Sequence, residues 1–203
     1  MAIFKYLAQN DHEQVDFFYD PVSGLKAIVA IHNTQLGPAI GGCRMYPYAS
    51  EEDALIDALR LARGMTYKSA INGLNFGGGK AVIIGDPKKY ASEILFRVYG
   101  RFIDGLNGRY ITCEDVGTCV DFMEWIRIET KHVVGLPTHI GGFGDPSPVT
   151  AHGVLVAMQA VMKKLTGSDS LENRKVAVQE LETSAILSAK NYMNLAQSFM
   201  LPM

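Results

Sequence analysis

Cysteine is scarce in this 203-residue sequence, and its three copies, Cys43, Cys113 and Cys119, form no CxxC pair. An odd number of cysteines without such spacing is typical of a reducing compartment, where thiols simply pack. The five histidines show no i, i+4 pairing, and no cluster of cysteine and histidine is present. This pattern argues against a zinc site.

Long apolar runs are also missing, since no stretch of about 18 apolar residues occurs. The N-terminus turns polar by Gln9, so it is too short and too polar for the apolar core of a signal peptide. We therefore expect no transmembrane helix and a cytoplasmic location. The net charge is −2 and no basic stripe is evident, which gives no electrostatic support for binding nucleic acid or an anionic membrane.

The composition is that of an ordinary globular protein, with 48% hydrophobic and 20% charged residues. The length suggests one large domain, or a domain plus a fragment. A chain of this size buries roughly two-thirds of its unfolded surface, so it needs neither disulfides nor metal to fold.

Strand patterns and helical periodicity alternate along the chain, which argues for an α/β domain. A Gly/Pro-rich segment, Gly135–Pro148, is expected to be a functional loop or hinge. A modest amphipathic helix is expected after Leu181, beyond the last glycine of the chain. We expect strands at 14–19, 25–32, 37–44, 81–84, 109–112 and 175–179, and helices at 51–65, 92–106, 118–130 and 147–165.

Three of these helices carry signals at their first residues. Ser50 and Asp53 have the spacing of a capping box. Thr118 could cap the third helix, and Ser147 with Pro148 would supply an N-cap and a first helical position.

Lys80 follows three glycines and precedes the apolar run Ala81–Ile84. A lysine at the mouth of a buried strand is partly desolvated, which favours the neutral amine that a general base needs. The glycines would let a substrate approach the main chain closely. The alternative is a glycine-rich turn with a solvated lysine. A P-loop is rejected, because Leu74 and Ala81 stand where that motif needs glycine and a hydroxyl residue.

Lys68 lies just past the predicted helix 51–65, and Asp115 follows the predicted strand 109–112. Lys68 could bind a substrate carboxylate beside Lys80, or it could be an ordinary cation at a helix C-terminus. Asp115 stands where ligands collect in α/β sheets, and a carboxylate near two lysines could shuttle protons. Its alternative is an exposed loop acid.

Seven motifs follow one another in a fixed order along the chain. They are His12–Val15, Gly37–Met45, Ala58–Lys68, Gly77–Lys80, Gly105–Thr112, Glu114–Gly117 and Pro146–Gly153. In these motifs the sequence resembles the Glu/Leu/Phe/Val amino acid dehydrogenases, most closely the leucine and phenylalanine branch, and the resemblance extends from about residue 12 to about residue 179. It implies an N-terminal substrate-binding domain, a mixed sheet flanked by helices, followed by the start of a Rossmann domain.

The resemblance implies reversible, NAD-dependent oxidative deamination of an L-amino acid to a 2-oxo acid and ammonia. Lys68 would hold the substrate carboxylate. Lys80 would activate the water that attacks the imino intermediate, and Asp115 would assist proton transfers to and from the amine.

The same resemblance implies a substrate cavity for a small apolar L-amino acid. Gly41 and Gly42 would line the main-chain end of the substrate, with Met65 nearby. Ile40 and Cys113 would form part of its side-chain pocket. In this family the domain also carries subunit contacts, which implies a homo-oligomer.

The cofactor region departs from the family. Thr150 would face the nicotinamide, and residues 175–179 match the first Rossmann strand. No Gly-x-Gly-x-x-Gly turn follows, and Glu180 and Glu182 would repel a pyrophosphate. Only 24 residues follow Gln179, against about 150 for a dinucleotide-binding domain. We therefore expect that this chain alone cannot bind NAD as its relatives do.

The expected organisation is a substrate-binding and dimerisation domain (1–147), a linker helix and hinge (148–174), and a vestigial Rossmann strand with a divergent tail (175–203). Three interpretations of the whole remain open. The first is a dehydrogenase sequence truncated or disrupted after the first Rossmann strand, inactive as an isolated chain. The second is a non-catalytic module that binds an amino acid or joins subunits. The third is a frame change that produced a tail without a selected role.

Overall fold

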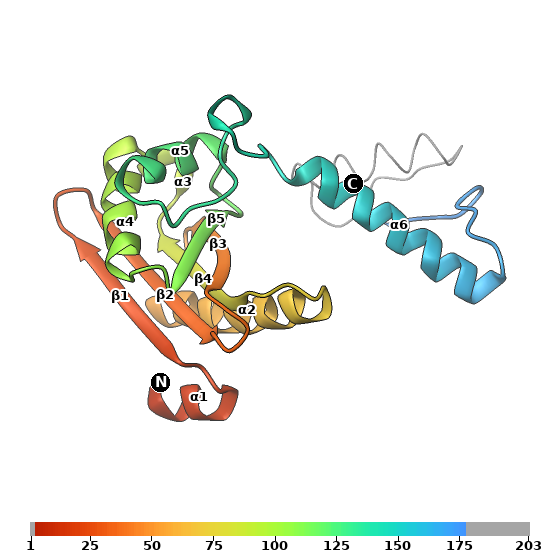
Figure 1. The fold of residues 1–203 in the computed structure, drawn as a ribbon, viewed down its shortest axis with the longest axis horizontal. Coiled ribbons are helices and arrows are strands. Elements are labelled where there is room, and N and C mark those ends of the chain that lie inside the picture. Colours follow the sequence, from red (N-terminus) through yellow and green to blue (C-terminus); the bar gives the residue numbers. More distant parts are fainter. Residues whose placement is uncertain (1–2, 178–203) are drawn as a thin grey trace. The chain divides into compact units, whose positions relative to one another are not determined.

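The computed structural model describes residues 3–177, which are coloured by sequence in Figure 1. The chain divides into two compact units between Gly144 and Asp145. The first unit contains the sheet, and the described part of the second contains a long helix. Among the described residues, no helix combines the length and the apolar character needed to cross a membrane.

The first unit is built on a five-stranded mixed sheet with the order β1-β2-β4-β3-β5. β1 (Gln14–Asp20) pairs antiparallel with β2 (Leu25–Asn33), and β2 pairs antiparallel with β4 (Gly77–Ile84). β3 (Ala39–Tyr46) lies parallel to β4 on one side and to β5 (Tyr110–Glu114) on the other. The predicted α/β class and mixed sheet are confirmed.

Helices cover both faces of this sheet, which gives three layers (Figure 1). Because successive strand residues point to opposite faces, Ile28 and Val82 pack against α2 (Glu51–Ile71), whereas Val29 and Ile83 pack on the side of α4 (Glu93–Gly105) and α5 (Val120–Glu129). The helices of the first unit are α1 (Ile3–Asn10), α2 (Glu51–Ile71), α3 (Pro87–Tyr90), α4 (Glu93–Gly105), α5 (Val120–Glu129) and a 3₁₀ turn (Thr138–Ile140).

α2 lies close to the sheet because small residues line its buried face. Ala54, Ala58 and Ala62 recur at intervals of four and are fully buried. Leu55 and Leu59 fill the space beside them, and burial of each leucine contributes about 1.5–3 kcal/mol. This close packing brings the last turns of α2 next to β4.

Two predicted boundaries near the glycines were wrong. The helix predicted to end near Met65 continues to Ile71, so Lys68 lies inside its last turn. Gly64 is tolerated within the helix, and the stop comes at Asn72 and Gly73, where Gly73 has φ +66°. The strand predicted from residue 81 begins at Gly77, so the three glycines belong to the sheet itself.

Two predicted caps were also wrong. Thr118 does not cap α5, whose N-cap is Cys119 without a side-chain hydrogen bond. Ser147 is the first residue of the helix α6 (Ser147–Thr166), and Pro146 is its N-cap. The predicted cap of α2 is confirmed, since the Asp53 N–H donates to Ser50 Oγ at 3.0 Å. Helices α1 and α3 were not predicted.

The second unit contains α6 (Ser147–Thr166), which ends at Gly167 with φ +80°. Leu171 packs back against Leu155, Met158 and Met162 of this helix. Residues 175–177 of the predicted strand are irregular, and the rest of that strand lies outside the described residues. The helix expected after Leu181 and the divergent tail also lie outside them.

Candidate active site

Lys80 and Asp115 form a buried ion pair on the α2 face of the sheet. The Lys80 side chain shares this face with Gly78 and Val82, and the residue is only 4% exposed. Its Nζ lies 2.8 Å from Asp115 Oδ2. Asp115 follows the last residue of β5, at the edge of the sheet where ligands collect in α/β proteins. Of the alternatives, the solvated lysine and the exposed loop acid are both excluded by this geometry.

The pair spans β3, which lies between the two strands that carry it. The strand register sets Ala81 of β4 and Glu114 of β5 on either side of Cys43. Gly42 therefore lies beneath the ion pair, and a Cβ atom at this position would come within 2.6 Å of Asp115 Cβ. The absence of a side chain at Gly42 leaves the space that Asp115 occupies.

The other glycines of the site allow close backbone contacts. A Cβ at Gly41 would lie 1.8 Å from the Gly79 carbonyl oxygen. A Cβ at Gly78 would lie 2.1 Å from the Thr66 backbone nitrogen on α2. These glycines are required by the packing of β3, β4 and α2, apart from any contact with a substrate.

Asp115 has a second cationic partner that the sequence analysis missed. Arg44 Nε donates to Asp115 Oδ2 at 2.9 Å, and Arg44 Nη1 donates to Asp57 Oδ2 at 2.9 Å. Tyr48 Oη also donates to Asp57 Oδ2, at 2.7 Å. The alternation of β3 could have placed Arg44 on the same face as Gly42, but no spacing in the sequence links it to Asp57 or Asp115.

The pKa of the Asp115 carboxyl is held below its usual value. Burial alone would raise this pKa, but the charges and hydrogen bonds of Lys80 and Arg44 outweigh it. The Thr118 hydroxyl fixes the loop behind it, accepting from the Asp115 N–H and donating to the Cys43 carbonyl, both at 2.9 Å. The site thus presents an ionised carboxylate beside a buried lysine.

The residues predicted for the side-chain pocket lie on β3 and β5. Ile40 and Cys113 are both partly buried. Burial raises the pKa of the Cys113 thiol to about 11, and that of Cys43 to about 12, so both thiols are neutral near pH 7. Neutral thiols behave as small apolar groups, which fits a packing role.

Lys68 and Met65 lie on the last turns of α2, with Lys68 exposed and Met65 half-buried. The Lys68 charge slightly lowers the pKa of the Cys113 thiol, against the larger opposite effect of burial. No ion pair joins Lys68 to Asp115 or to any other acid within residues 3–177. Thr150 is an exposed residue in the first turn of α6, in the second unit. Residues 3–177 contain no grouping of acids, histidines and cysteines that could hold a metal ion.

Comparison with known proteins identifies a family whose members resemble this chain. The model of the family described as "Glu/Leu/Phe/Val dehydrogenase, dimerisation domain" matches residues 12–132. A leucine dehydrogenase from Geobacillus stearothermophilus is 62% identical over 179 residues, which are 88% of this chain and 49% of that protein. A phenylalanine dehydrogenase from Caldalkalibacillus thermarum is 56% identical over 173 residues, 85% of this chain and 46% of that protein.

Solved structures agree with this comparison. An L-tryptophan dehydrogenase from Nostoc punctiforme has a TM-score of 0.70 at 42% identity, covering 98% of this chain and 56% of that one. A hetero-hexameric glutamate dehydrogenase from Thermus thermophilus, in a Leu-bound form, has a TM-score of 0.78 at 26% identity. The match covers 94% of this chain and 49% of that one. The chain thus spans about half the length of the curated relatives it matches.

Proposed function

Since this chain belongs to the Glu/Leu/Phe/Val dehydrogenase family, we propose that residues 12–132 bind the substrate of an L-amino acid dehydrogenase. The proposed reaction is reversible oxidative deamination of an amino acid to a 2-oxo acid and ammonia. The relatives named leucine, phenylalanine and tryptophan dehydrogenase support an apolar substrate.

The observation that carries this proposal is the ion pair between Lys80 and Asp115. Deamination requires water to add to an imino carbon and a proton to move to the departing amine. Lys80 is proposed to activate the water, because a buried amine can exchange a proton with an adjacent carboxylate. Asp115, held ionised 2.8 Å away, is proposed to accept and return protons at the substrate nitrogen.

The substrate carboxylate is proposed to bind Lys68. This lysine is exposed at the end of α2 and has no ion-pair partner within residues 3–177, so its ammonium group is available. Gly41, Gly42 and Met65 are proposed to line the main-chain end of the substrate. Gly41 and Gly42 are adjacent residues of β3, and Gly42 lies directly against Asp115.

Ile40 and Cys113 are proposed to line the pocket for the substrate side chain. The thiol is neutral at pH 7 because burial raises the pKa of Cys113 to about 11. An apolar wall of this kind favours a branched-chain or aromatic side chain over a carboxylate.

NAD is the proposed cofactor, and it would accept the hydride from the amino acid. Thr150 is the residue proposed to face the nicotinamide. An exposed hydroxyl in the first turn of a helix does not define a dinucleotide site alone, and no Gly-x-Gly-x-x-Gly turn occurs in residues 3–177. No step is therefore derived through the cofactor. A cytoplasmic location is part of the same proposal, supported by three free cysteines.

Titration calorimetry with L-leucine, L-phenylalanine and L-glutamate tests substrate binding directly. We expect heat with the two apolar amino acids, and a loss of at least about tenfold in affinity for Lys68→Met, since each 1.4 kcal/mol is tenfold. Lys5→Met is the matched control, because Lys5 is an exposed lysine on α1, an element that carries no residue of the proposed site. No heat from folded wild-type protein, or equal losses in both variants, would contradict the proposal.

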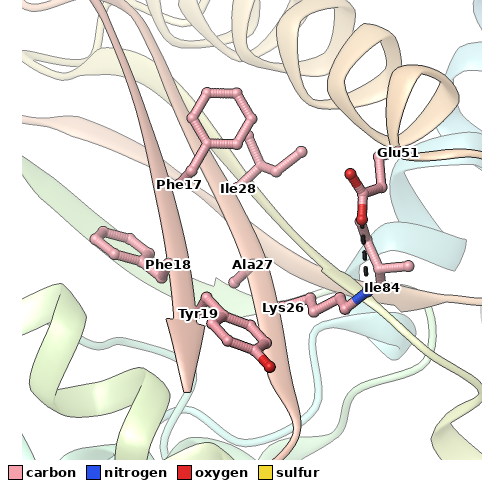
Figure 2. Close-up of a pocket in the computed structure, with 8 residues that line it drawn as sticks. All are labelled: Phe17, Phe18, Tyr19, Lys26, Ala27, Ile28, Glu51 and Ile84. Atoms are coloured by element: carbon pink, nitrogen blue, oxygen red, sulfur yellow. Dashed lines mark hydrogen bonds and ion pairs between the residues drawn. The ribbon is translucent and has the colours of Figure 1, made fainter. Parts of the chain in front are cut away.

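A second copy of the chain is proposed to bind along β1. Among the strands of residues 3–177, β1 lies at the edge of the sheet and pairs only with β2. Phe17 and Tyr19 are 58% and 65% exposed there. Figure 2 shows both rings over a groove that includes Ile28 and Ile84, whereas Phe18 points away. These features favour an assembly role, and the family description names a dimerisation domain.

A further inference from the structure

Both cationic partners of Asp115 contact the same carboxylate oxygen. Lys80 Nζ and Arg44 Nε lie 2.8 and 2.9 Å from Oδ2. Within residues 3–177, no hydrogen bond is made to Oδ1. The Asp115 side chain remains 24% exposed. One oxygen is thus fixed by two cations, while the other is free to contact a ligand.

Arg44 is itself held at its far end. Its Nη1 pairs with Asp57 Oδ2 on α2 at 2.9 Å, and the Tyr48 hydroxyl donates to the same oxygen at 2.7 Å. Arg44 and Asp57 are partly buried, with side chains 24% and 29% exposed. Planar guanidinium groups bind two acceptors in fixed directions, so this anchor sets where Arg44 Nε points.

We propose that Arg44 is a positioning residue for Asp115. Anchored by Asp57 and Tyr48, it holds Oδ2 of Asp115 in place and turns Oδ1 toward the substrate nitrogen. The proposed role of Asp115 in the dehydrogenase reaction is the premise of this inference.

Charge balance gives Arg44 a second effect. Arg44, Lys80, Asp57 and Asp115 together carry two positive and two negative charges. A guanidinium does not deprotonate in proteins, so Arg44 stays a counter-ion for Asp115 whenever Lys80 gives up its proton. Without Arg44, Lys80 would be the sole cation in contact with a partly buried carboxylate. Its proton would then be held by Asp115 and unavailable for water activation.

Carbon-13 NMR of the aspartate carboxyl groups tests this in the whole chain, without a cofactor. The Asp115 signal is assigned by its loss in Asp115→Asn, and the pH is lowered from about 8 to about 3. In the wild type, Lys80 and Arg44 keep the Asp115 pKa below its usual value. In Arg44→Gln, we expect that pKa to rise by about one unit or more, because an opposite charge has been removed.

Asp57→Asn distinguishes the electrostatic effect of Arg44 on Asp115 from a general loosening of the site. This change removes a negative charge and releases Arg44 to Asp115, so the Asp115 pKa should not rise. Tyr48→Phe keeps every charge and should leave the pKa close to that of the wild type. The other titratable groups near Asp115 within residues 3–177 are Glu114, Cys113, Lys68 and, on the opposite face of β3, Cys43, and no variant alters them.

The outcomes are distinct. A pKa that is unchanged in Arg44→Gln, or that rises equally in Asp57→Asn, would overturn the inference. If Arg44→Gln fails to fold, Arg44→Lys replaces it. A smaller rise of the Asp115 pKa is then expected, because lysine keeps the positive charge but lacks the planar guanidinium that binds two acceptors. Calorimetry with L-leucine on the same samples tests the proposed function separately from the role of Arg44. Absence of binding by the wild type would refute the proposed function, whereas the Asp115 titration would still decide the role of Arg44.

Discussion

At the scale of single residues, the site depends on charges that compensate one another inside the protein. Lys80 is 4% exposed, and an ammonium group at such a depth is unfavourable unless it is paired. Asp115 supplies that pairing, and Arg44 is a second cation in contact with the same carboxylate oxygen. The space for this arrangement comes from a residue without a side chain, Gly42.

Gly42→Ala should displace Asp115. The new methyl group would lie 2.6 Å from Asp115 Cβ and 2.7 Å from the Glu114 carbonyl oxygen, and the latter belongs to the backbone. We expect a loss of about 1–3 kcal/mol in unfolding free energy, typical of overpacking, together with weaker binding of L-leucine. Urea denaturation and calorimetry measure the two effects.

Gly105→Ala is the matched control, because a Cβ at Gly105 meets no atom within 4 Å. It should leave stability and ligand binding close to those of the wild type. A Gly42→Ala protein that behaves like this control would contradict the placement of Asp115 against β3.

Two adjacent histidines should make stability depend on pH. The rings of His12 and His32 lie 4.9 Å apart, and burial lowers the pKa of both below 6.5. The folded state therefore binds fewer protons than the unfolded state below about pH 6.5. The unfolding free energy should fall as the pH drops through 6.5 toward the lowered pKa values, and should be nearly constant above.

Urea denaturation at about pH 7.5 and about pH 5.5 measures this dependence. His12→Gln retains a group that can donate to the Leu59 carbonyl, which His12 Nε2 contacts at 2.8 Å. It should reduce the difference between the two pH values. An undiminished difference would show that these histidines are not its source.

At the scale of elements, α2 connects the core to the site. Its buried alanines set the distance to the sheet, and its last turns carry Met65 and Lys68. β4 meets it with Gly78, where a Cβ would collide with the Thr66 backbone. The position of Met65 and Lys68, which are proposed to bind the substrate, thus depends on how firmly this helix is anchored at both ends.

Ser50→Ala should destabilise the first turn of α2. The Ser50 hydroxyl accepts from the Asp53 N–H at 3.0 Å, and loss of such an N-cap costs about 1 kcal/mol. Thermal unfolding followed by circular dichroism measures the change. Ser147→Ala at α6 is the control, because no side-chain cap bond exists there. Equal effects of the two substitutions would argue against capping as the cause.

At the scale of the whole molecule, the sheet has two edges, and the β1 edge is open. In the described part of the chain β1 pairs with β2 alone, and its outward residues include exposed aromatic rings. An unpaired strand edge with apolar side chains is a ready surface for another chain. The groove in Figure 2 is part of that surface, and Lys26 and Glu51 form an ion pair at its border.

Phe17→Glu should weaken self-association. A carboxylate on β1 would be desolvated in an interface with a second copy, which is unfavourable. Sedimentation velocity over a range of concentrations should show an oligomer for the wild type and smaller species for this variant. Val22→Glu is the control, since Val22 is 90% exposed outside β1. A monomeric wild type, or dissociation by Val22→Glu alone, would contradict assembly through β1.

Much of this organisation could be predicted from the sequence because it depends on local patterns. Five strands and four helices were placed from alternation, periodicity and caps, and the family resemblance from ordered motifs was confirmed. The glycines before Lys80 misled the prediction of β4, since glycine lowers strand propensity wherever it occurs. In the structure these glycines belong to the strand. Their positions require glycine because Asn33, Thr66 and Tyr110 approach the backbone too closely for any side chain.

The sequence by itself determined the family, the α/β class and the chemical character of the site: lysines and an aspartate set among glycines. Only the tertiary structure decided which charges meet. Arg44 and Asp115 are 71 residues apart, and their contact depends on the register of three parallel strands and on the packing of α2. Such contacts leave no local pattern, because the residues that make them become neighbours only when the sheet has formed.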